Sequence, residues 1–229
     1  MNYEQMSNNS LYLSGEVVSM PKFTHSIIGE DFYEINLKVK RLSEQYDILP
    51  VTVSDRLMAD SDFSVGNTVS VVGQFRSYNK LENDRSRLML TVFVREVVEN
   101  DPYANPNHIS LSGFICKPPV FRVTPFKREI ADLLIAVNRA YNKSDYIPCI
   151  AWGRNARFVR GMDVGEKVTV TGRIQSREYQ KTIGEETTVR IAYEVSVNKV
   201  AVMNGYHDTP IDDREAVADD NYTNYYYEV

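Results

Sequence analysis

Features that often reveal a protein's class are scarce in this chain of 229 residues. It has only two cysteines, Cys116 and Cys149, too few for a disulfide framework or a metal site built from cysteine alone. Its longest purely apolar run covers residues 133–137, whereas a membrane span needs roughly 20 residues. The first ten residues combine neither a basic start nor an apolar core, which disfavours a secretory leader. We therefore expect a cytoplasmic protein with no membrane partner.

Motifs for catalysis are also missing from the sequence. It contains no glycine-rich phosphate loop, HExxH, CxxC or GxSxG, and its three histidines, His25, His108 and His207, are widely spread. Carboxylates are abundant, but none stands beside a partner in a recognisable catalytic spacing. We expect a protein that is not an enzyme and that needs no metal or cofactor.

The chain does contain an internal repeat. LSGEVVS (13–19) matches LSGFICK (111–117), and VGNTVSVVGQFRS (65–77) matches VGEKVTVTGRIQS (164–176), at offsets of 98 and 99 residues. An offset this constant predicts two copies of one domain. We place the copies at 1–105 and 106–206, with a short, stiff linker rich in proline and asparagine at 100–108. An acidic tail follows over 207–229.

Within each copy, apolar and polar residues alternate as in half-buried strands. The expected strands are 11–18, 32–41, 46–54, 68–77 and 88–98, then 109–116, 130–139, 146–153, 167–178 and 190–201. A short helical segment, 55–63 or 154–161, separates the third and fourth strand of each copy. This layout predicts an all-β protein made of two tandem OB-fold barrels. Pro50 and Pro148 interrupt the third strands and indicate an open edge or a bulge there.

Charge is distributed unevenly between the copies. Residues 1–108 carry 10 Lys+Arg and 15 Asp+Glu, residues 109–206 carry 15 and 9, and residues 207–229 carry 1 and 7. The second copy therefore has a net charge of +6, although the whole chain has −5. A polyanion binds by displacing counterions through Lys and Arg, so the second copy is the candidate for nucleic-acid binding.

Aromatic residues support this assignment. Ile147, Cys149 and Ala151 suit the core, so Tyr146 and Trp152 should point outward from the same strand. Arg173, Arg177 and Tyr179 share the outward parity on the next strand, and Tyr141 follows the second strand in a loop. Rings interleaved with arginine suit the stacking of unpaired bases. The alternative is that these rings only pack across the sheet.

These residues resemble a known family. Arg122, Thr124-Pro125, IAVNR (135–139), Ala151-Trp152-Gly153 and GRIQSREY (172–179) follow the pattern of the bacterial single-stranded DNA-binding protein family, and the resemblance covers about 109–203. It implies sequence-independent binding of single-stranded DNA in replication, recombination and repair, in association with the nucleoid. It also implies four barrels per assembly, which a tandem chain would reach as a homodimer. The expected DNA-binding residues are Arg122, Arg139, Tyr141, Lys143, Tyr146, Trp152, Arg154, Arg173, Arg177 and Tyr179.

The first copy and the tail depart from the family pattern. Ser43 and Ser54 stand where Tyr141 and Trp152 are found in the second copy. We therefore expect the first barrel to serve mainly in assembly. The alternative is a second, differently arranged groove made of Tyr46, Tyr78, Lys38, Lys40 and Arg76.

The tail ends in NYYYEV instead of an acidic run closed by Pro-Phe, so its recruitment of replication and repair proteins remains a hypothesis. We expect it to be mobile. Two other functions stay open at this point. One is a primosomal or other protein-binding OB module with secondary nucleic-acid contact, and the other is an RNA-binding OB protein.

Overall fold

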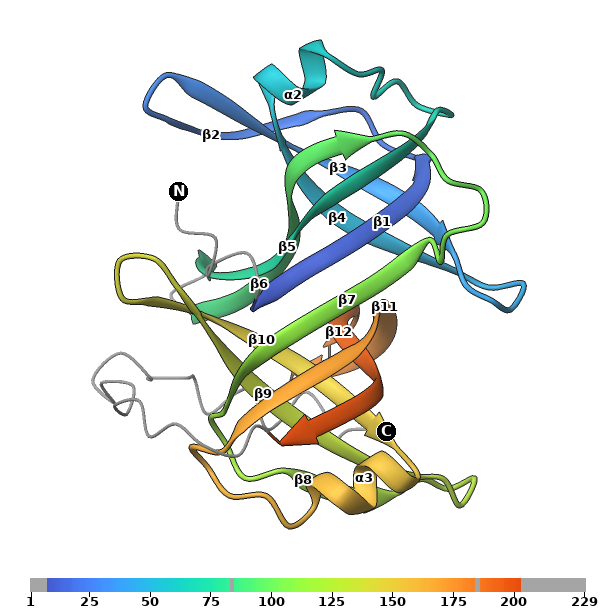
Figure 1. Cartoon of the computed structure of the whole chain (residues 1–229), viewed down its shortest axis with the longest axis vertical. Coiled ribbons are helices and arrows are strands. Elements are labelled where there is room, and N and C mark those ends of the chain that lie inside the picture. Colours follow the sequence, from blue (N-terminus) through green and yellow to red (C-terminus); the bar gives the residue numbers. More distant parts are fainter. Residues whose placement is uncertain (1–7, 83–84, 184–185, 203–229) are drawn as a thin grey trace.

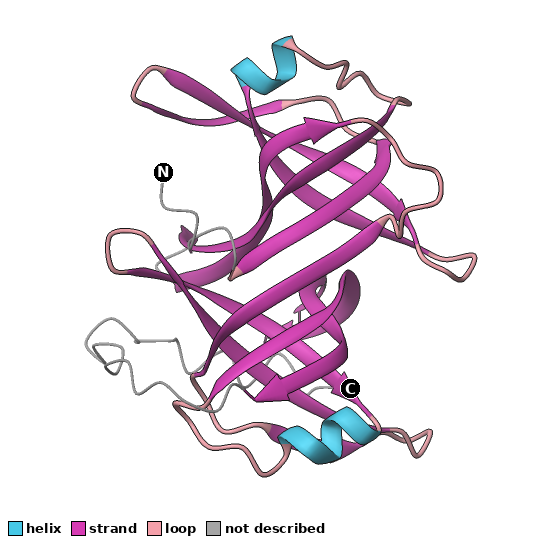
Figure 2. Ribbon diagram, viewed as in Figure 1, coloured by secondary structure: helices cyan, strands magenta, loops and turns pink. Residues whose placement is uncertain are grey.

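The computed structural model describes residues 8–82, 85–183 and 186–202, which form two similar units joined side by side (Figure 1). The elements of the first unit are β1 (Asn9–Val17), β2 (Lys22–Ile27), β3 (Glu30–Lys40), β4 (Tyr46–Ser54), α2 (Asp55–Ala59), β5 (Thr68–Glu82) and β6 (Arg85–Val98). Those of the second are β7 (Asn107–Ile115), β8 (Val120–Val123), β9 (Glu129–Arg139), β10 (Lys143–Trp152), α3 (Arg154–Val159), β11 (Lys167–Ile183) and β12 (Glu186–Val202). Strands dominate both units (Figure 2). The expected acidic tail lies outside the described residues.

Each unit is a small OB-fold barrel, so the predicted fold class is confirmed. In the first barrel, β1 pairs with β5 and closes onto β3, while β4 meets β6 through a short parallel ladder. In the second barrel, β7, β11, β9, β10 and β12 repeat these pairings. The helices α2 and α3 follow the third barrel strands, as predicted, but are shorter than expected. No helix among the described residues has the length and apolar character to cross a membrane.

Two short strands, β2 and β8, were not predicted. All six residues of β2 are exposed, so the strand has no alternating apolar pattern to detect. β8 has only four residues, none of them fully buried. Both strands lie at the ends of the sheet, where they extend β3 and β9.

Alternation along the strands builds the core of each barrel. Ile35, Leu37 and Val39 of β3 are fully buried, as the sequence pattern predicts. The register of β5 against β6 shifts at Gly73, where a Cβ atom would collide with the carbonyl oxygen of Phe93. Gly172 occupies the same position on β11. Glycine is needed at both bulges because two backbones approach closely there.

The prolines of the third strands lie where each barrel closes. Pro50 pairs with Asn36 across an antiparallel ladder without a register shift, and Pro148 pairs likewise with Leu134. The parallel ladders to β6 and β12 begin at the residues that follow, Val51 and Cys149. The predicted bulge is therefore absent from the β3–β4 and β9–β10 ladders. Each proline instead precedes the closing ladder, where its missing N–H costs little.

The two barrels share one continuous sheet. β1 pairs antiparallel with β7 from Asn9↔Leu111 to Leu13↔Asn107, which gives a twelve-stranded sheet. Leu11 lies opposite Ile109, its own counterpart at the offset of 98 residues. The barrels are thus related by an approximate two-fold axis through this pair, as two subunits of a symmetric dimer would be. The sheet, and not only the linker, fixes their relative orientation.

Candidate nucleic-acid interface

The second outer face consists of the side chains of β8, β9, β10, β12 and β11 that point away from the core of the second barrel. Residues paired across neighbouring strands share a face, so the strand register identifies its members. Arg122 on β8 lies opposite Ile130, which lies opposite Trp152 on β10. Ile150, two residues before Trp152, pairs with Ser196 on β12. The predicted residues on this face are Arg122, Tyr146, Trp152, Arg173, Arg177 and Tyr179.

The rings on this face differ in exposure. Trp152, the last residue of β10, is 37% exposed, and Tyr146 and Tyr179 are half-buried. The guanidinium carbon of Arg177 lies 5.8 Å from the centroid of the Tyr179 ring. An arginine beside a fixed ring combines a phosphate ligand with a stacking surface, which is the combination that single-strand grooves use.

Three further predicted residues border this face. Tyr141 is 95% exposed at the tip of the β9–β10 turn, where both it and Asn142 have positive φ angles of 62° and 53°. Lys143 begins β10 and is exposed. Arg154 is exposed at the other end of β10, where α3 begins. These residues therefore extend the basic and aromatic surface beyond both ends of β10.

Two carboxylates, which the sequence analysis did not identify, lie under the arginines of the second outer face. Asp132 accepts a hydrogen bond from Nε of Arg122 at 2.9 Å, and Glu194 accepts one from Gln175 at 2.6 Å and lies 4.0 Å from Arg177. Burial raises the pKa of both carboxyl groups, although the neighbouring arginines oppose this shift. Each carboxylate also has one buried oxygen without a hydrogen-bond partner among the described residues. The two carboxylates therefore hold Arg122 and Arg177 in place, although burying a charged carboxylate costs free energy.

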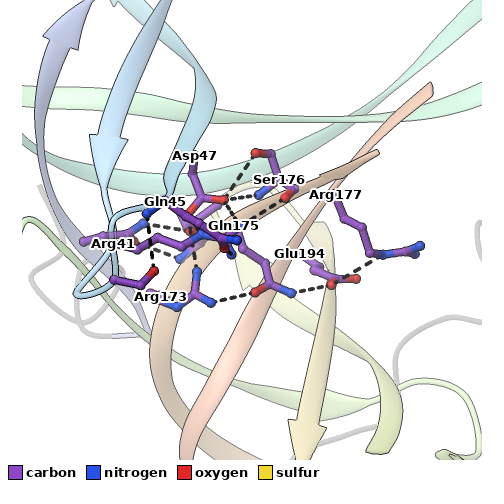
Figure 3. A network of polar contacts seen from close by, with 11 residues as sticks. Arg41, Gln45, Asp47, Arg173, Gln175, Ser176, Arg177 and Glu194 are labelled. Atoms are coloured by element: carbon purple, nitrogen blue, oxygen red, sulfur yellow. Dashed lines mark hydrogen bonds and ion pairs between the residues drawn. The ribbon is translucent and has the colours of Figure 1, made fainter. Parts of the chain in front are cut away.

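Arg173 has a second role, at the junction between the barrels (Figure 3). Its guanidinium lies 3.3 Å from Asp47 of the first barrel and donates to Gln175 at 2.9 Å. The fully buried Asp47 also accepts two hydrogen bonds from Arg41, at 2.8 and 2.7 Å, and one from the backbone N–H of Ser176 at 2.7 Å. A chain of polar contacts thus runs from the first barrel through Gln175 to the second outer face.

Arg139 belongs to an equivalent set of contacts at the junction, in which the two barrels exchange roles. Asp145 of the second barrel accepts from the backbone N–H of Ser77 in the first barrel at 2.7 Å, and Arg139 lies 3.3 Å from it. The hydroxyl of Ser77 in turn accepts from the backbone N–H of Tyr146 at 2.8 Å. Burial raises the pKa of Asp145. Sequence reasoning assigned Arg139 and Arg173 to DNA, and the structure places both beside buried carboxylates at the junction.

Metal-binding chemistry has no support in the described residues. They contain no group of three or more His, Cys, Asp or Glu side chains that could hold a metal ion. Both thiols are free, and burial raises the pKa of Cys116 to about 12 and also raises that of Cys149.

Comparison with known proteins places this interface in a family context. The profile of the Single-strand binding protein family matches residues 106–203. The Single-stranded DNA-binding protein A of Bacillus subtilis (strain 168) is 31% identical over 106 residues, which cover 43% of this chain and 62% of that protein. The Single-stranded DNA-binding protein of Clostridium tetani (strain Massachusetts / E88) is 30% identical over 104 residues, or 42% of this chain and 70% of the relative.

A solved structure extends the likeness to both barrels. The wild-type single-stranded DNA binding protein from Thermus aquaticus aligns with a TM-score of 0.68 at 16% identity, over 90% of this chain and 98% of that chain. At this identity the likeness shows the shared fold. The profile match and the relative from Clostridium tetani carry the assignment, since 70% of that relative is covered. The chain therefore belongs to the single-strand binding protein family.

Proposed function

We propose that this protein binds single-stranded DNA without regard to sequence, through the second outer face. The observation that carries the proposal is the register. It sets the rings of Trp152, Tyr146 and Tyr179 on the same face as the guanidiniums of Arg122 and Arg177. Unpaired bases stack on such rings, at about 1–3 kcal/mol per base, while cations neutralise the backbone. The net charge of +6 over residues 109–206 and the names of the relatives support the same ligand.

The binding requires no chemistry and no cofactor. Asp132 and Glu194 hold the guanidiniums of Arg122 and Arg177 before DNA arrives, which reduces the side-chain entropy lost on binding. The same carboxylates compete with the DNA phosphates for these guanidiniums, and we expect this competition to be the larger effect. Stacked and neutralised, the strand is shielded from re-pairing and from nucleases. This protection serves replication, recombination and repair, in the cytoplasm where the nucleoid lies.

The proposal includes a homodimer of four barrels, with the first barrel contributing mainly to assembly. β2 and β8 end the twelve-stranded sheet, so each has an edge without a strand partner in the described part of the chain. A mass of two chains by light scattering at tens of micromolar is expected, and a monomeric mass would remove this part of the proposal. The acidic residues 207–229 remain the candidate segment for recruiting replication and repair proteins.

Competition separates this function from the two alternatives. Unlabelled single-stranded DNA, RNA and duplex DNA of equal length compete for the protein against a fluorescent oligothymidine. Single-stranded DNA should displace the probe at the lowest concentration. Equal or better competition by RNA would favour the RNA-binding function, and an absence of nucleic-acid binding at low salt would favour the protein-binding module.

A further inference from the structure

Gln175 of β11 lies in the middle of a row of polar side chains on the second outer face. Its direct cross-strand partner on β12 is Glu194, and Arg173 and Arg177 flank it on its own strand, each two residues away. Side chains at this spacing along a strand point to the same face, so these groups form one row (Figure 3). Gln175 and Glu194 are buried, whereas the side chains of the two arginines are partly exposed. The buried pair therefore lies between the junction and an arginine of the proposed interface.

The amide of Gln175 has one orientation that satisfies its neighbours. A guanidinium can only donate hydrogen bonds, and an ionised carboxylate can only accept them. The amide oxygen of Gln175 accordingly accepts from Arg173 at 2.9 Å, and its nitrogen donates to Oε1 of Glu194 at 2.6 Å. Arg173 is held in turn by Asp47 of the first barrel at 3.3 Å. The first barrel thus helps to fix the direction in which Gln175 donates.

The carboxylate of Glu194 is held closer to Gln175 than to Arg177. The oxygen that accepts from the amide, Oε1, lies 4.0 Å from Nε of Arg177, and Oε2 is buried without a hydrogen-bond partner among the described residues. Burial raises the pKa of Glu194, and the hydrogen bond from Gln175 opposes this rise more than Arg177 does. Loss of the amide would therefore draw the carboxylate and Arg177 together.

Other charged or titratable groups also surround Glu194. Those that interact with it electrostatically from neighbouring strands are Asp132, Arg122, Arg173 and Cys149. The like charge of Asp132 raises the pKa of Glu194, and the opposite charge of Arg122 lowers it. Gln175 differs from these groups because it contacts the carboxylate without adding a charge of its own. It can therefore set the position of the carboxylate without changing the net charge of the face.

The first barrel shows that the fold does not require this arrangement. At the repeat offset of 99 residues, Arg76 corresponds to Gln175. Its cross-strand partner is Thr91, which carries no charge and whose hydroxyl bonds to another threonine at 2.8 Å. The glutamine on this strand, Gln74, accepts instead from Arg76, at 2.9 and 3.3 Å. The same ladder forms here without a buried acid, so Glu194 and its amide donor serve something other than barrel closure.

We propose that Gln175 is a positioning residue for DNA binding, which keeps the carboxylate of Glu194 away from Arg177 and so favours the contact of this guanidinium with a phosphate. This inference rests on the proposed function of the second outer face and adds a control of its affinity. Glu194 competes with DNA for Arg177, and the competition weakens with the distance between the two charges. Gln175 maintains that distance through its bond to Glu194, while Arg173 fixes its orientation from the junction.

Removal of the amide tests this role. Affinity for an oligothymidine of about 8 nucleotides, which fits a single OB-fold, is measured by fluorescence anisotropy with the full chain. Gln175→Leu removes both hydrogen bonds and nearly keeps the volume. Gln175→Asn keeps an amide in the same polar site but is one methylene too short to bridge Glu194 and Arg173, so it should fold even if leucine is not tolerated. The matched control is Gln74→Leu, because Gln74 is also buried and its cross-strand partner, Phe93, carries no charge. Thermal unfolding is recorded for each protein.

At neutral pH both Gln175 variants should bind about 3-fold or more weakly than the unmodified chain, as expected when one partly exposed ion pair tightens. Gln74→Leu should bind as well as the unmodified chain. The loss should disappear in the Glu194→Gln background and shrink as the pH falls toward about 4, because a neutral side chain at position 194 does not compete for Arg177. A purely structural role of Gln175 would instead weaken binding by the same factor in both backgrounds.

Unchanged or tighter binding by both Gln175 variants at neutral pH would overturn the positioning role, as would an equal loss in the Glu194→Gln background. Either outcome leaves the proposed function intact if Trp152→Ala still weakens binding of the same oligothymidine. Failure of the unmodified chain to bind the oligothymidine would refute the proposed function itself.

Discussion

Asp47 is predicted to be the most costly single carboxylate to remove from the junction between the barrels. It is completely buried, and its partners are Arg41, Arg173 and the backbone N–H of Ser176. Asp47→Asn keeps one acceptor for Ser176 but leaves two guanidiniums without their counter-ion. Removal of one member of a buried ion pair costs about 3–5 kcal/mol. Because the arginine side chains are 22% and 28% exposed, we expect the lower end, about 3 kcal/mol.

Urea unfolding measures this loss. Fluorescence of Trp152 reports on the second barrel, and far-UV circular dichroism reports on both. The free energy of unfolding should fall by about 3 kcal/mol, which corresponds to a decrease in Tm of about 6–12 °C for a chain of this size. Coincident transitions from the two probes would justify a single free energy.

Two other substitutions serve as controls for Asp47→Asn. Asp145→Asn should cost less, about 1–2 kcal/mol, because Asp145 has one arginine at 3.3 Å, a buried oxygen without a hydrogen-bond partner in the described residues, and a pKa raised by burial. Glu16→Gln removes an exposed pair with Lys38 at 3.9 Å and should cost less than about 1 kcal/mol. A loss below about 1 kcal/mol for Asp47→Asn, or one no larger than that of Glu16→Gln, would refute the reasoning.

Two further predictions concern DNA binding. Burial raises the pKa of Asp132 and Glu194, so both carboxylates protonate before ordinary ones as the pH falls toward about 4. The affinity for oligothymidine should rise over that range, because Arg122 and Arg177 lose their counter-ions. For the same reason, Glu194→Gln should bind more tightly than the unmodified chain at neutral pH and show a flatter pH profile. An affinity of the unmodified chain that does not rise as the pH falls would contradict the competition of Asp132 and Glu194 with the DNA phosphates. The logarithm of the binding constant should fall linearly with the logarithm of the salt concentration, with a slope of about −0.7 per phosphate neutralised. Arg122→Gln removes one such contact and should reduce the magnitude of the slope by about 0.7. A flat salt response would favour the protein-binding module.

The sequence predicted the barrels well because their strands have one buried and one exposed face. The alternation around Ile35 and Leu37 reveals such a strand, whereas β2, exposed throughout, leaves no such pattern. The junction was not predictable, because Asp47 and its partner Ser176 are 129 residues apart in sequence. Arg173 has the outward parity of a DNA ligand, and only its contact with Asp47 reveals the second role.

The candidate site shows the same limits. Trp152 and Tyr146 were identified because small or apolar residues between them fix their parity. Asp132 was overlooked because an outward carboxylate on a strand usually faces water, and only tertiary packing buries it. Comparison of the two copies at the offset of 98 residues found Ser54 at the position that corresponds to Trp152. It could not show that Phe32 and Phe93 approach that position from neighbouring strands.

Fluorescence of Trp152 during titration with poly(dT) tests the central claim most directly, because it is the only tryptophan in the chain. Its ring lies on the second outer face and is 37% exposed, so a base stacked on it should quench its emission. We predict saturable quenching that follows complex formation seen by gel shift and that is reversed by added salt. Unchanged emission while the gel shift shows a complex would place the DNA elsewhere and contradict the proposed interface.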